Sequence, residues 1–186
     1  SSRTEVGIAA VTSVVVLGIG VLPAIAVAVV LSIIDVVRRA ALPADAVMGY
    51  SEHDQRYVDV GTHPDSGVTP GVVVYRLYAP LVFAKARHVA DRLRTLAGTA
   101  DPPARLVVLD LQAVWEIDVT AAQVLADLHD ELELGGVDLR FARANRPLRE
   151  QMVRMLDGHG TSRERFFPSA SAAVDDFLAK ESAGAP

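Results

Sequence analysis

The chain has 186 residues, a net charge of −5 at pH 7 and no cysteine. This length allows one ordinary domain together with a short additional segment. The acidic balance argues against a nucleic-acid partner, and the lack of cysteine excludes disulfides, thiolate chemistry and cysteine-ligated metals.

An apolar run without a charged residue occupies residues 6–34. A hydrocarbon core of about 30 Å needs about 20 apolar helical residues, so the run predicts a membrane-embedded segment. Two glycines and a proline interrupt it in Gly18–Pro23, and a proline inside a helix removes a backbone donor and clashes with the preceding turn. The pattern therefore predicts two short helices, Val6–Leu17 and Ala24–Val37, with a single tilted and kinked helix as the alternative.

Two basic residues, Arg38 and Arg39, follow the apolar run. Positive residues beside a membrane segment favour the cytoplasmic side, so the rest of the chain is expected in the cytoplasm. Short helices at membrane depth need other protein around their backbone groups, so we expect the chain to be the C-terminal part of a longer, multi-pass protein of the cell membrane. The expected division is terminal membrane helices in residues 1–39, a linker in 40–46 and a cytoplasmic domain in 47–182.

Strand patterns alternate with helix patterns in the cytoplasmic domain. Runs rich in β-branched and aromatic residues predict strands over Val47–Tyr50, Tyr57–Val60, Gly71–Tyr78, Leu106–Leu111 and Val137–Ala142. Apolar residues repeated every three or four positions predict helices over Phe83–Ala97, Thr120–Leu134, Arg146–Leu156 and Ala170–Lys180. This alternation predicts an α/β fold with a mixed, mostly parallel sheet flanked by helices, and Phe166 and Phe167 are expected beneath the last helix.

Three motifs in series resemble one protein family. Val74–Ala84 resembles the start of the first helix of the STAS domain in SulP-type anion transporters, and Leu109–Ala121 resembles the strand and helix start that follow. Upstream, Gly20–Ala40 resembles the final membrane helices of the same family. The chain departs from the family at Lys85, where asparagine is usual, because lysine cannot cap a helix by accepting a backbone hydrogen bond.

The resemblance implies a function for the parent protein. It would be a secondary anion transporter, with sulfate as the leading substrate and bicarbonate or a dicarboxylate as alternatives, and its STAS domain would be regulatory. The inorganic anion would bind between half-helix N-termini of a membrane domain that this chain does not include, so no residue here is assigned to the transport site. A homodimer in contact with membrane lipid is expected.

The segment Asp118-Val119-Thr120 offers a candidate regulatory site. In the related anti-sigma-factor antagonists, the residue at the Thr120 position is the phosphoacceptor, so the resemblance makes Thr120 a candidate. A phosphate there would add roughly −1.5 to −2 charge units beside Asp118. The plainer alternative has Asp118 as the N-cap of a helix and Thr120 in its first turn. The phosphoacceptor reading leads to the alternative function, a membrane-tethered signalling module that binds a protein partner.

Other candidates are an aromatic residue and a group of arginines. Trp115 either marks an exposed contact surface or packs over the sheet end. Seven arginines lie between positions 140 and 165, and Arg143, Arg146 and Arg149 are candidate anion or interface contacts. They could touch anionic headgroups, or pair with the acidic helix that precedes them.

Catalysis and metal binding find little support. Asp110 and Asp118 could suggest acid–base chemistry, but no nucleophile or cofactor motif accompanies them. The five histidines lack the spacing of metal ligands, and neither a Walker-type loop nor a GxGxxG motif occurs. We therefore expect no enzyme activity, no metal and no cofactor.

Overall fold

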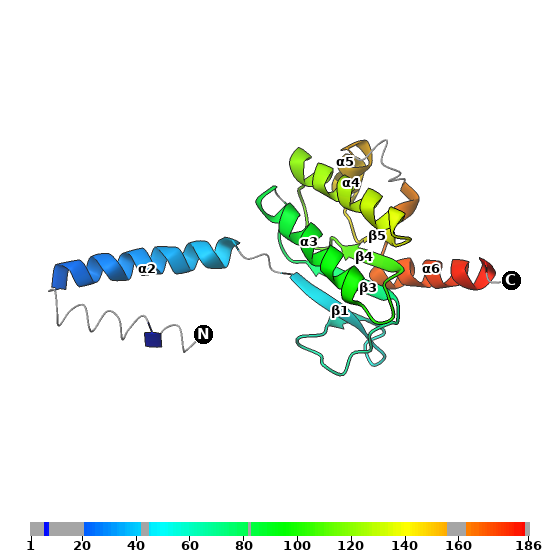
Figure 1. Cartoon of the computed structure of the whole chain (residues 1–186), viewed down its shortest axis with the longest axis horizontal. Helices are drawn as coiled ribbons and strands as arrows, with labels where there is room; N and C mark the ends of the chain where they lie inside the picture. Colours follow the sequence, from blue (N-terminus) through cyan, green and yellow to red (C-terminus); the bar gives the residue numbers. More distant parts are fainter. Residues whose placement is uncertain (1–5, 8–20, 42–44, 82, 156–162, 185–186) are drawn as a thin grey trace. The chain divides into compact units, whose positions relative to one another are not determined.

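The structure is a computed structural model that describes residues 6–7, 21–41, 45–81, 83–155 and 163–184 (Figure 1). The chain divides into two compact units, Ser1–Leu42 and Pro43–Pro186. Each unit is described by itself below.

The N-terminal unit contains helix α2, Val21–Ala41. Pro23 is its third residue, where a missing N–H costs no hydrogen bond because the first four N–H groups of a helix have no intrahelical acceptor. The predicted helix Ala24–Val37 thus exists but begins earlier and ends later. Only Val6 and Gly7 of the other predicted helix are described, both as helical. Of the predicted break Gly18–Pro23, residues 18–20 lie outside the described residues, and Val21–Pro23 belong to α2, so the break is wrong for that part.

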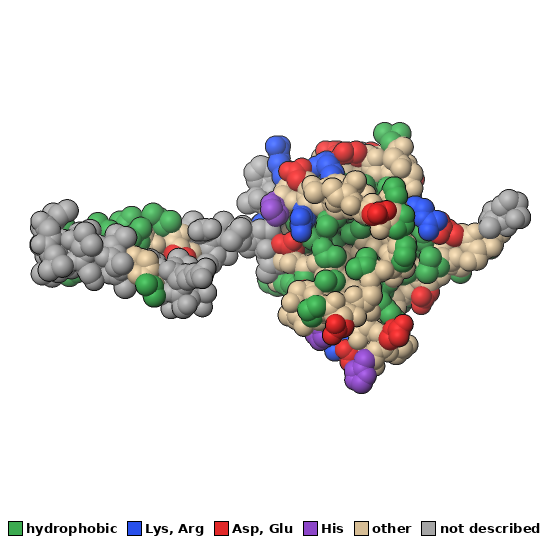
Figure 2. Space-filling model, turned by 60° about the horizontal axis from the view of Figure 1, so that its bottom comes forward, with side chains coloured by type: hydrophobic (Ala, Val, Ile, Leu, Met, Phe, Trp, Pro, Cys, Tyr) green, Lys and Arg blue, Asp and Glu red, His purple; other side chains and the backbone are tan. Residues whose placement is uncertain are grey.

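Most described side chains of α2 are apolar and exposed, as Figure 2 shows for its green surface atoms. Leu22, Ile33 and Val36 are 81, 57 and 63 % exposed, and Ile25, Val29, Val30 and Ile34 are exposed as well. No helix in the described part of the chain combines the length and hydrophobicity that a membrane crossing needs. The membrane segment therefore stays a prediction.

The C-terminal unit contains a six-stranded sheet in the order β2-β1-β3-β4-β5-β6. The strands are β1 Asp45–Ser51, β2 Arg56–Asp59, β3 Val72–Leu77, β4 Leu106–Asp110, β5 Asp138–Ala142 and β6 Phe166–Phe167. β1 runs antiparallel to β2 and β3, and β3 to β6 are mutually parallel. The mixed, mostly parallel sheet of the predicted α/β fold is confirmed.

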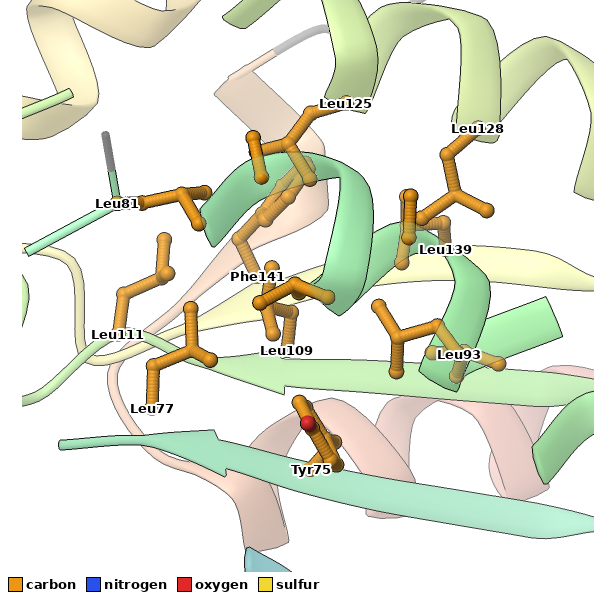
Figure 3. Close-up of a cluster of buried hydrophobic side chains, with 14 of the residues drawn as sticks. Tyr75, Leu77, Leu81, Leu93, Leu109, Leu111, Leu125, Leu128, Leu139 and Phe141 are labelled. Carbon is orange, nitrogen blue, oxygen red and sulfur yellow. The ribbon is translucent and has the colours of Figure 1, made fainter. Parts of the chain in front are cut away.

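Helices cover both faces of this sheet. They are α3 Phe83–Thr99, α4 Val119–Leu134, α5 Arg146–Met155 and α6 Ala170–Gly184, with a 3-10 turn at Arg163–Arg165 before β6. The first three pack on one face, where Leu93 and Leu125 meet Leu109 and Phe141 of the sheet (Figure 3). Leu148 of α5 belongs to the same buried cluster. α6 packs on the other face against Val74, Leu106 and Val108. Because both faces are covered, the central strands are apolar without alternation.

Three local details differ from the sequence-based expectations. Phe166 and Phe167 form a short strand, and Phe166 faces the first core, stacking on Phe141 with ring centroids 5.0 Å apart, so only Phe167 packs with α6. α2 ends at Ala41 and β1 begins at Asp45, so these elements occupy most of the range expected as a linker. Lys85 is the third residue of α3, which is inside the helix and not at its cap.

A buried histidine on α4 predicts a stabilising substitution. His129 is 1 % exposed, its Nδ1 lies 3.3 Å from Oδ1 of Asp130, and its Nε2 meets no hydrogen-bond partner among the described residues. A buried polar atom without a partner costs about 1–3 kcal/mol. His129→Leu is therefore expected to raise the free energy of unfolding by about 1 kcal/mol in urea denaturation. His129→Gln, which keeps a polar group, should bring no gain, and a loss of stability in His129→Leu would contradict the prediction.

Candidate functional site

The candidate site lies at the carboxyl ends of the parallel strands, where open α/β folds commonly bind ligands. Asp110 ends β4 and is fully buried. β3 and β4 pair in a register that sets Arg76 beside Asp110, and β4 and β5 pair so that Ala142 lies opposite the same aspartate. Arg143 follows directly. Strand register thus brings three charged residues from separate parts of the chain to one point.

Every acceptor position of the Asp110 carboxylate is used. Arg76 Nε donates to Oδ2 at 2.9 Å, and Arg143 donates Nε to Oδ1 at 3.0 Å and Nη2 to Oδ2. The backbone N–H of Gln112 donates to Oδ1 at 3.1 Å. Two guanidinium groups thus share one buried carboxylate, and the cluster carries an excess positive charge. Because its carboxylate is buried and fully hydrogen-bonded, Asp110 is a structural anchor of the strand ends and not an acid–base group.

Arg143 adopts a left-handed backbone conformation with φ of 57°. Few residues other than glycine and asparagine do so, because the Cβ atom is crowded there. Its backbone N–H donates to the carbonyl of Phe167 at 3.0 Å, which fixes this conformation against β6. The side chain is 27 % exposed, so it reaches from the buried aspartate toward solvent.

The segment before α4 has the geometry of a helix N-cap followed by a first helical turn, which is the plainer of the two alternatives for Asp118 and Thr120. Asp118 is the N-cap, and its Oδ1 accepts from the N–H of Ala121 at 2.7 Å. Thr120 lies in the first turn and is exposed, as is Val119. No observation tests phosphorylation of Thr120, so its role as a phosphoacceptor stays a prediction.

The N-cap predicts a measurable contribution to stability. Asp118→Ala removes the acceptor for the Ala121 N–H and a negative charge at the positive end of α4. We expect the free energy of unfolding to fall by about 1 kcal/mol in urea denaturation. Asp127→Ala is the matched control, because Asp127 is exposed in the middle of the same helix and, within the described residues, accepts a hydrogen bond from Gln123 alone. Equal losses in the two variants would show that the cap is not the cause.

The candidate aromatic residue is exposed. Trp115 lies in the loop between β4 and α4 with 64 % of its surface accessible, and its neighbour Glu116 is exposed too. Val114 and Ile117 are the buried anchors of this loop. The alternative that Trp115 packs over the sheet end is therefore wrong.

The predicted group of arginines divides among several partners. Arg143 binds Asp110, whereas Arg146 donates to Glu150 at 2.8 Å within α5, and this bond lowers the pKa of the Glu150 carboxyl. Arg149 is exposed on the same helix. The three candidates thus do not converge on one another.

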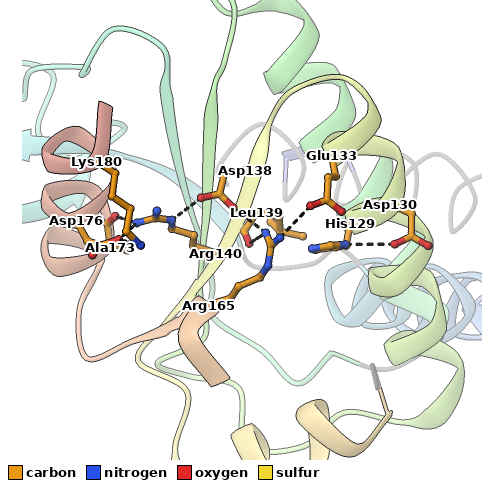
Figure 4. Close-up of polar contacts among 10 residues, drawn as sticks. All are labelled: His129, Asp130, Glu133, Asp138, Leu139, Arg140, Arg165, Ala173, Asp176 and Lys180. Atoms are coloured by element: carbon orange, nitrogen blue, oxygen red, sulfur yellow. Dashed lines mark hydrogen bonds and ion pairs between the residues drawn. The ribbon is translucent and has the colours of Figure 1, made fainter. Parts of the chain in front are cut away.

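Two further arginines are tied into the fold, as Figure 4 shows. Arg140 is buried between Asp138 and Asp176, and Arg165 donates to Asp138 and to Glu133 of α4. Arg165 thus pairs with the acidic helix α4, as the second alternative expected, whereas Arg140 and Arg143 pair with carboxylates elsewhere in the domain. In the described residues no group of three or more histidine, aspartate or glutamate side chains has the arrangement of a metal site.

Arg76 is the residue that sequence reasoning missed. It lies one position before the end of β3, and Asp110 ends β4. The sequence patterns place both residues near the ends of two predicted strands. This contact could have been predicted, because two consecutive buried strands of a parallel sheet commonly pair, and pairing sets their carboxyl ends side by side. The pairing of Arg143 with Asp110 could not have been predicted, because it depends on the left-handed turn after β5, and no sequence motif marks that turn.

Comparison with known proteins places this fold and site in a family. The STAS-domain family matches residues 63–163, and the chain belongs to it. A probable sulfate transporter of Mycobacterium tuberculosis is 34 % identical over 177 residues, covering 94 % of this chain and 31 % of the relative. A chloroplastic sulfate transporter of Arabidopsis thaliana is 25 % identical over 173 residues, covering 88 % of this chain and 25 % of the relative. The chain thus spans about a third or less of the relatives it matches, and their names are those of transporters and not of enzymes.

Solved structures agree on the fold. The murine Solute Carrier 26 family member A9 anion transporter in its inward-facing state superposes with a TM-score of 0.65 at 22 % identity, over 91 % of this chain and 28 % of that one. The STAS domain of a SulP transporter from Vibrio cholerae superposes with a TM-score of 0.52 at 20 % identity, over 67 % of this chain and 94 % of that one. The resemblance to the STAS domain of SulP-type proteins is confirmed at the level of the fold.

Proposed function

We propose that this chain is the C-terminal part of a secondary anion transporter of the cell membrane, with sulfate as its leading substrate. Bicarbonate and dicarboxylates are the alternative substrates. The observation that carries the proposal is a match over 94 % of the chain to a protein named as a probable sulfate transporter, joined to a STAS-like fold. The STAS unit would lie in the cytoplasm and act as a regulatory module, outside the permeation path.

The exposed apolar helix supports the membrane part of the proposal. Seven large apolar side chains of α2 are exposed, and burying apolar surface yields about 25 cal/mol for each Å². Such a helix gains stability from lipid or from other membrane helices. The proposal therefore includes contact with membrane lipid and, in the parent protein, a homodimer.

Uptake of labelled sulfate tests the transport proposal. The parent protein is reconstituted into vesicles, and unlabelled bicarbonate and dicarboxylate compete with labelled sulfate. We expect saturable uptake, and the competitor that suppresses it at the lowest concentration identifies the substrate class. Absence of uptake by protein that is demonstrably folded would overturn the proposal.

Removal of residues 43–186 from the parent tests the regulatory role of the STAS unit. If this unit lies outside the permeation path, its removal should change the amount of uptake without changing the order of the competitors. A changed order would contradict the regulatory assignment, and vesicles without protein give the background.

The alternative function is a phosphorylation switch at Thr120. The exposed position of Thr120 in the first turn of α4 favours it, because a helix N-terminus stabilises a phosphate. A kinase-treated sample would carry one phosphate on Thr120, and Thr120→Ala would carry none. Capture of a protein partner by Thr120→Glu but not by Thr120→Ala would support this function, and equal capture by both would contradict it.

A further inference from the structure

A pocket of about 330 Å³ lies beside the Asp110 cluster. Its walls come from β2 and the turn that follows it, the end of β3, the segment after β4, the turn after β5 and the start of α6. The volume falls at the lower end of the range of small-ligand sites. Neither the transport proposal nor the phosphorylation switch uses this pocket.

Three arginines line the pocket, from β2, from β3 and from the turn after β5. They are Arg56, Arg76 and Arg143. Among the described residues of the lining, one carboxylate is present, that of Asp59, whose Oδ1 is already bonded to the N–H of Gly61 at 2.7 Å. The three lining arginines thus face the carboxylates of Asp59 and the buried Asp110, while Asp175 of α6 acts on Tyr57 from outside the lining. Among the lining residues and Asp110, one positive charge is left over, which favours an anion.

Donors of these arginines remain available in the pocket. Arg143 uses Nε and Nη2 on Asp110, and Arg76 uses Nε on Asp110 and Nη2 on the carbonyl of Tyr57. Within the described residues, the Nη1 groups of both and the whole guanidinium of Arg56 make no hydrogen bond. Planar guanidinium donors match the geometry of sulfate and phosphate oxygens.

The start of α6 forms another part of the wall. Ser169, Ala170 and Ser171 line the pocket, and Ser169 Oγ caps the helix by accepting from the N–H of Ala172 at 3.0 Å. The first N–H groups of a helix have no intrahelical acceptor and carry a partial positive charge. α6 therefore adds to the positive potential that the arginines create.

The backbone of Arg143 is consistent with a ligand-binding role. A left-handed conformation at a residue other than glycine is strained and persists where the surroundings enforce it. At this position the Asp110 bonds hold the side chain at the pocket wall. A glycine would relieve the backbone but would remove a guanidinium from the site.

We propose that this pocket binds a tetrahedral oxyanion with two negative charges, either free sulfate or phosphate or the phosphate group of a small ester. Arg56, Arg76 and Arg143 would supply the charge-assisted hydrogen bonds, with Asp110 holding two of the three in place. The site belongs to the STAS unit, so binding does not require transport and stands apart from the proposed function.

Isothermal titration of the whole chain in non-ionic detergent tests the proposal. Sulfate, phosphate and glycerol 3-phosphate are titrated separately at an ionic strength held constant with sodium chloride. We expect saturable binding of at least one of them. Similar affinities for sulfate and phosphate identify a free-anion site, and tighter binding of glycerol 3-phosphate identifies an ester site. No saturable binding above chloride would overturn the proposal.

Arg56→Gln provides the decisive variant. Arg56 is exposed on β2, so its replacement leaves the core and the Asp110 cluster intact. Affinity should fall about tenfold, as expected for the loss of a charged hydrogen bond. Arg149→Gln removes the same charge from the exposed face of α5 and should leave affinity unchanged. Equal affinity in Arg56→Gln and the unmodified chain, with far-UV circular dichroism showing both folded, would overturn the assignment.

Discussion

Replacing Asp110 by asparagine is expected to lower the free energy of unfolding of the C-terminal unit by about 3 kcal/mol. Asp110 is fully buried and balances two guanidinium groups, those of Arg76 and Arg143. Asparagine keeps the size of the side chain but turns one acceptor oxygen into a donor that faces an arginine. Removing one partner of a buried pair costs about 3–5 kcal/mol because it leaves uncompensated charge behind. The side chains of Arg76 and Arg143 are 15 % and 27 % exposed, so water offsets part of the cost and the lower figure applies.

Urea denaturation followed by circular dichroism measures this effect. Asp127→Asn is the matched control, because it removes the same charge from an exposed position on α4, and it should change stability by less than about 0.5 kcal/mol. The double variant Asp110→Asn with Arg143→Gly should recover part of the loss, since it removes one stranded guanidinium and relieves the left-handed backbone. An Asp110→Asn variant as stable as the control would show that the cluster is not the anchor of this sheet edge.

The same variant bears on the proposed oxyanion site. Asp110→Asn raises the excess charge at the pocket from one unit to two, because the three arginines then meet only Asp59. A variant that still folds should therefore bind sulfate or phosphate more tightly than the unmodified chain. Weaker binding would mean that placement of the guanidiniums by Asp110 matters more than the added charge.

Sequence patterns predicted the elements that carry long apolar repeats. β3, β4, α3 and α4 are within a few residues of their expected bounds, because their apolar faces are wide and are buried on the sheet. β6 was missed because two residues cannot show a period, and its pairing with β5 follows only from the course of the chain after α5. α2 begins at Val21 because a proline is tolerated in a first helical turn, which the expected break did not take into account.

The candidate site shows the limits of the same reasoning. Asp118 was recognised as a cap because capping is local and depends on residues three positions apart. The choice between an exposed and a packed Trp115 stayed open, because it depends on what lies beyond the sheet end. The arginines looked like a shared surface, yet their partners come from distant parts of the chain: Asp110 for Arg143 and Glu133 for Arg165. Side-chain pairing of this kind follows from strand register and helix placement, and not from spacing.

Replacing Arg140 by alanine should cost about 2 kcal/mol, less than the loss at Asp110 although Arg140 has more partners. Arg140 is 5 % exposed, and its Nε donates to Asp138 at 2.7 Å, while its Nη1 donates to Asp176 at 2.9 Å and to the carbonyl of Ala173 at 2.6 Å. The guanidinium also lies 4.9 and 5.4 Å from the ring centroids of Phe167 and Phe177. It thus connects β5 and β6 to α6, and alanine would remove both the contacts and the packing.

The carboxylates left behind limit this cost. Asp138 keeps Arg165 at 2.7 Å, and Asp176 keeps Lys180 at 2.9 Å. The side chains of the two aspartates are 30 % and 37 % exposed, so water reaches both. The bond from Lys180 is the main reason that the pKa of Asp176 lies below its usual range, with Arg140 a smaller cause. Asp176 should therefore stay ionised in the variant at neutral pH, and no buried charge is stranded.

Arg140→Met separates the packing of this side chain from its charge. Methionine keeps an unbranched apolar stem between the two phenylalanine rings, where its sulfur makes favourable contacts, but it donates no hydrogen bond. If packing dominates, Arg140→Met should lose less than about 1 kcal/mol in urea denaturation, while Arg140→Ala loses about 2. Equal losses would assign the stability to the ion pairs. The partly exposed carboxylates of Asp138 and Asp176 keep their other partners, so we expect the smaller loss in Arg140→Met. Asp110 differs, because its removal strands the charge of two arginines at the edge of the sheet.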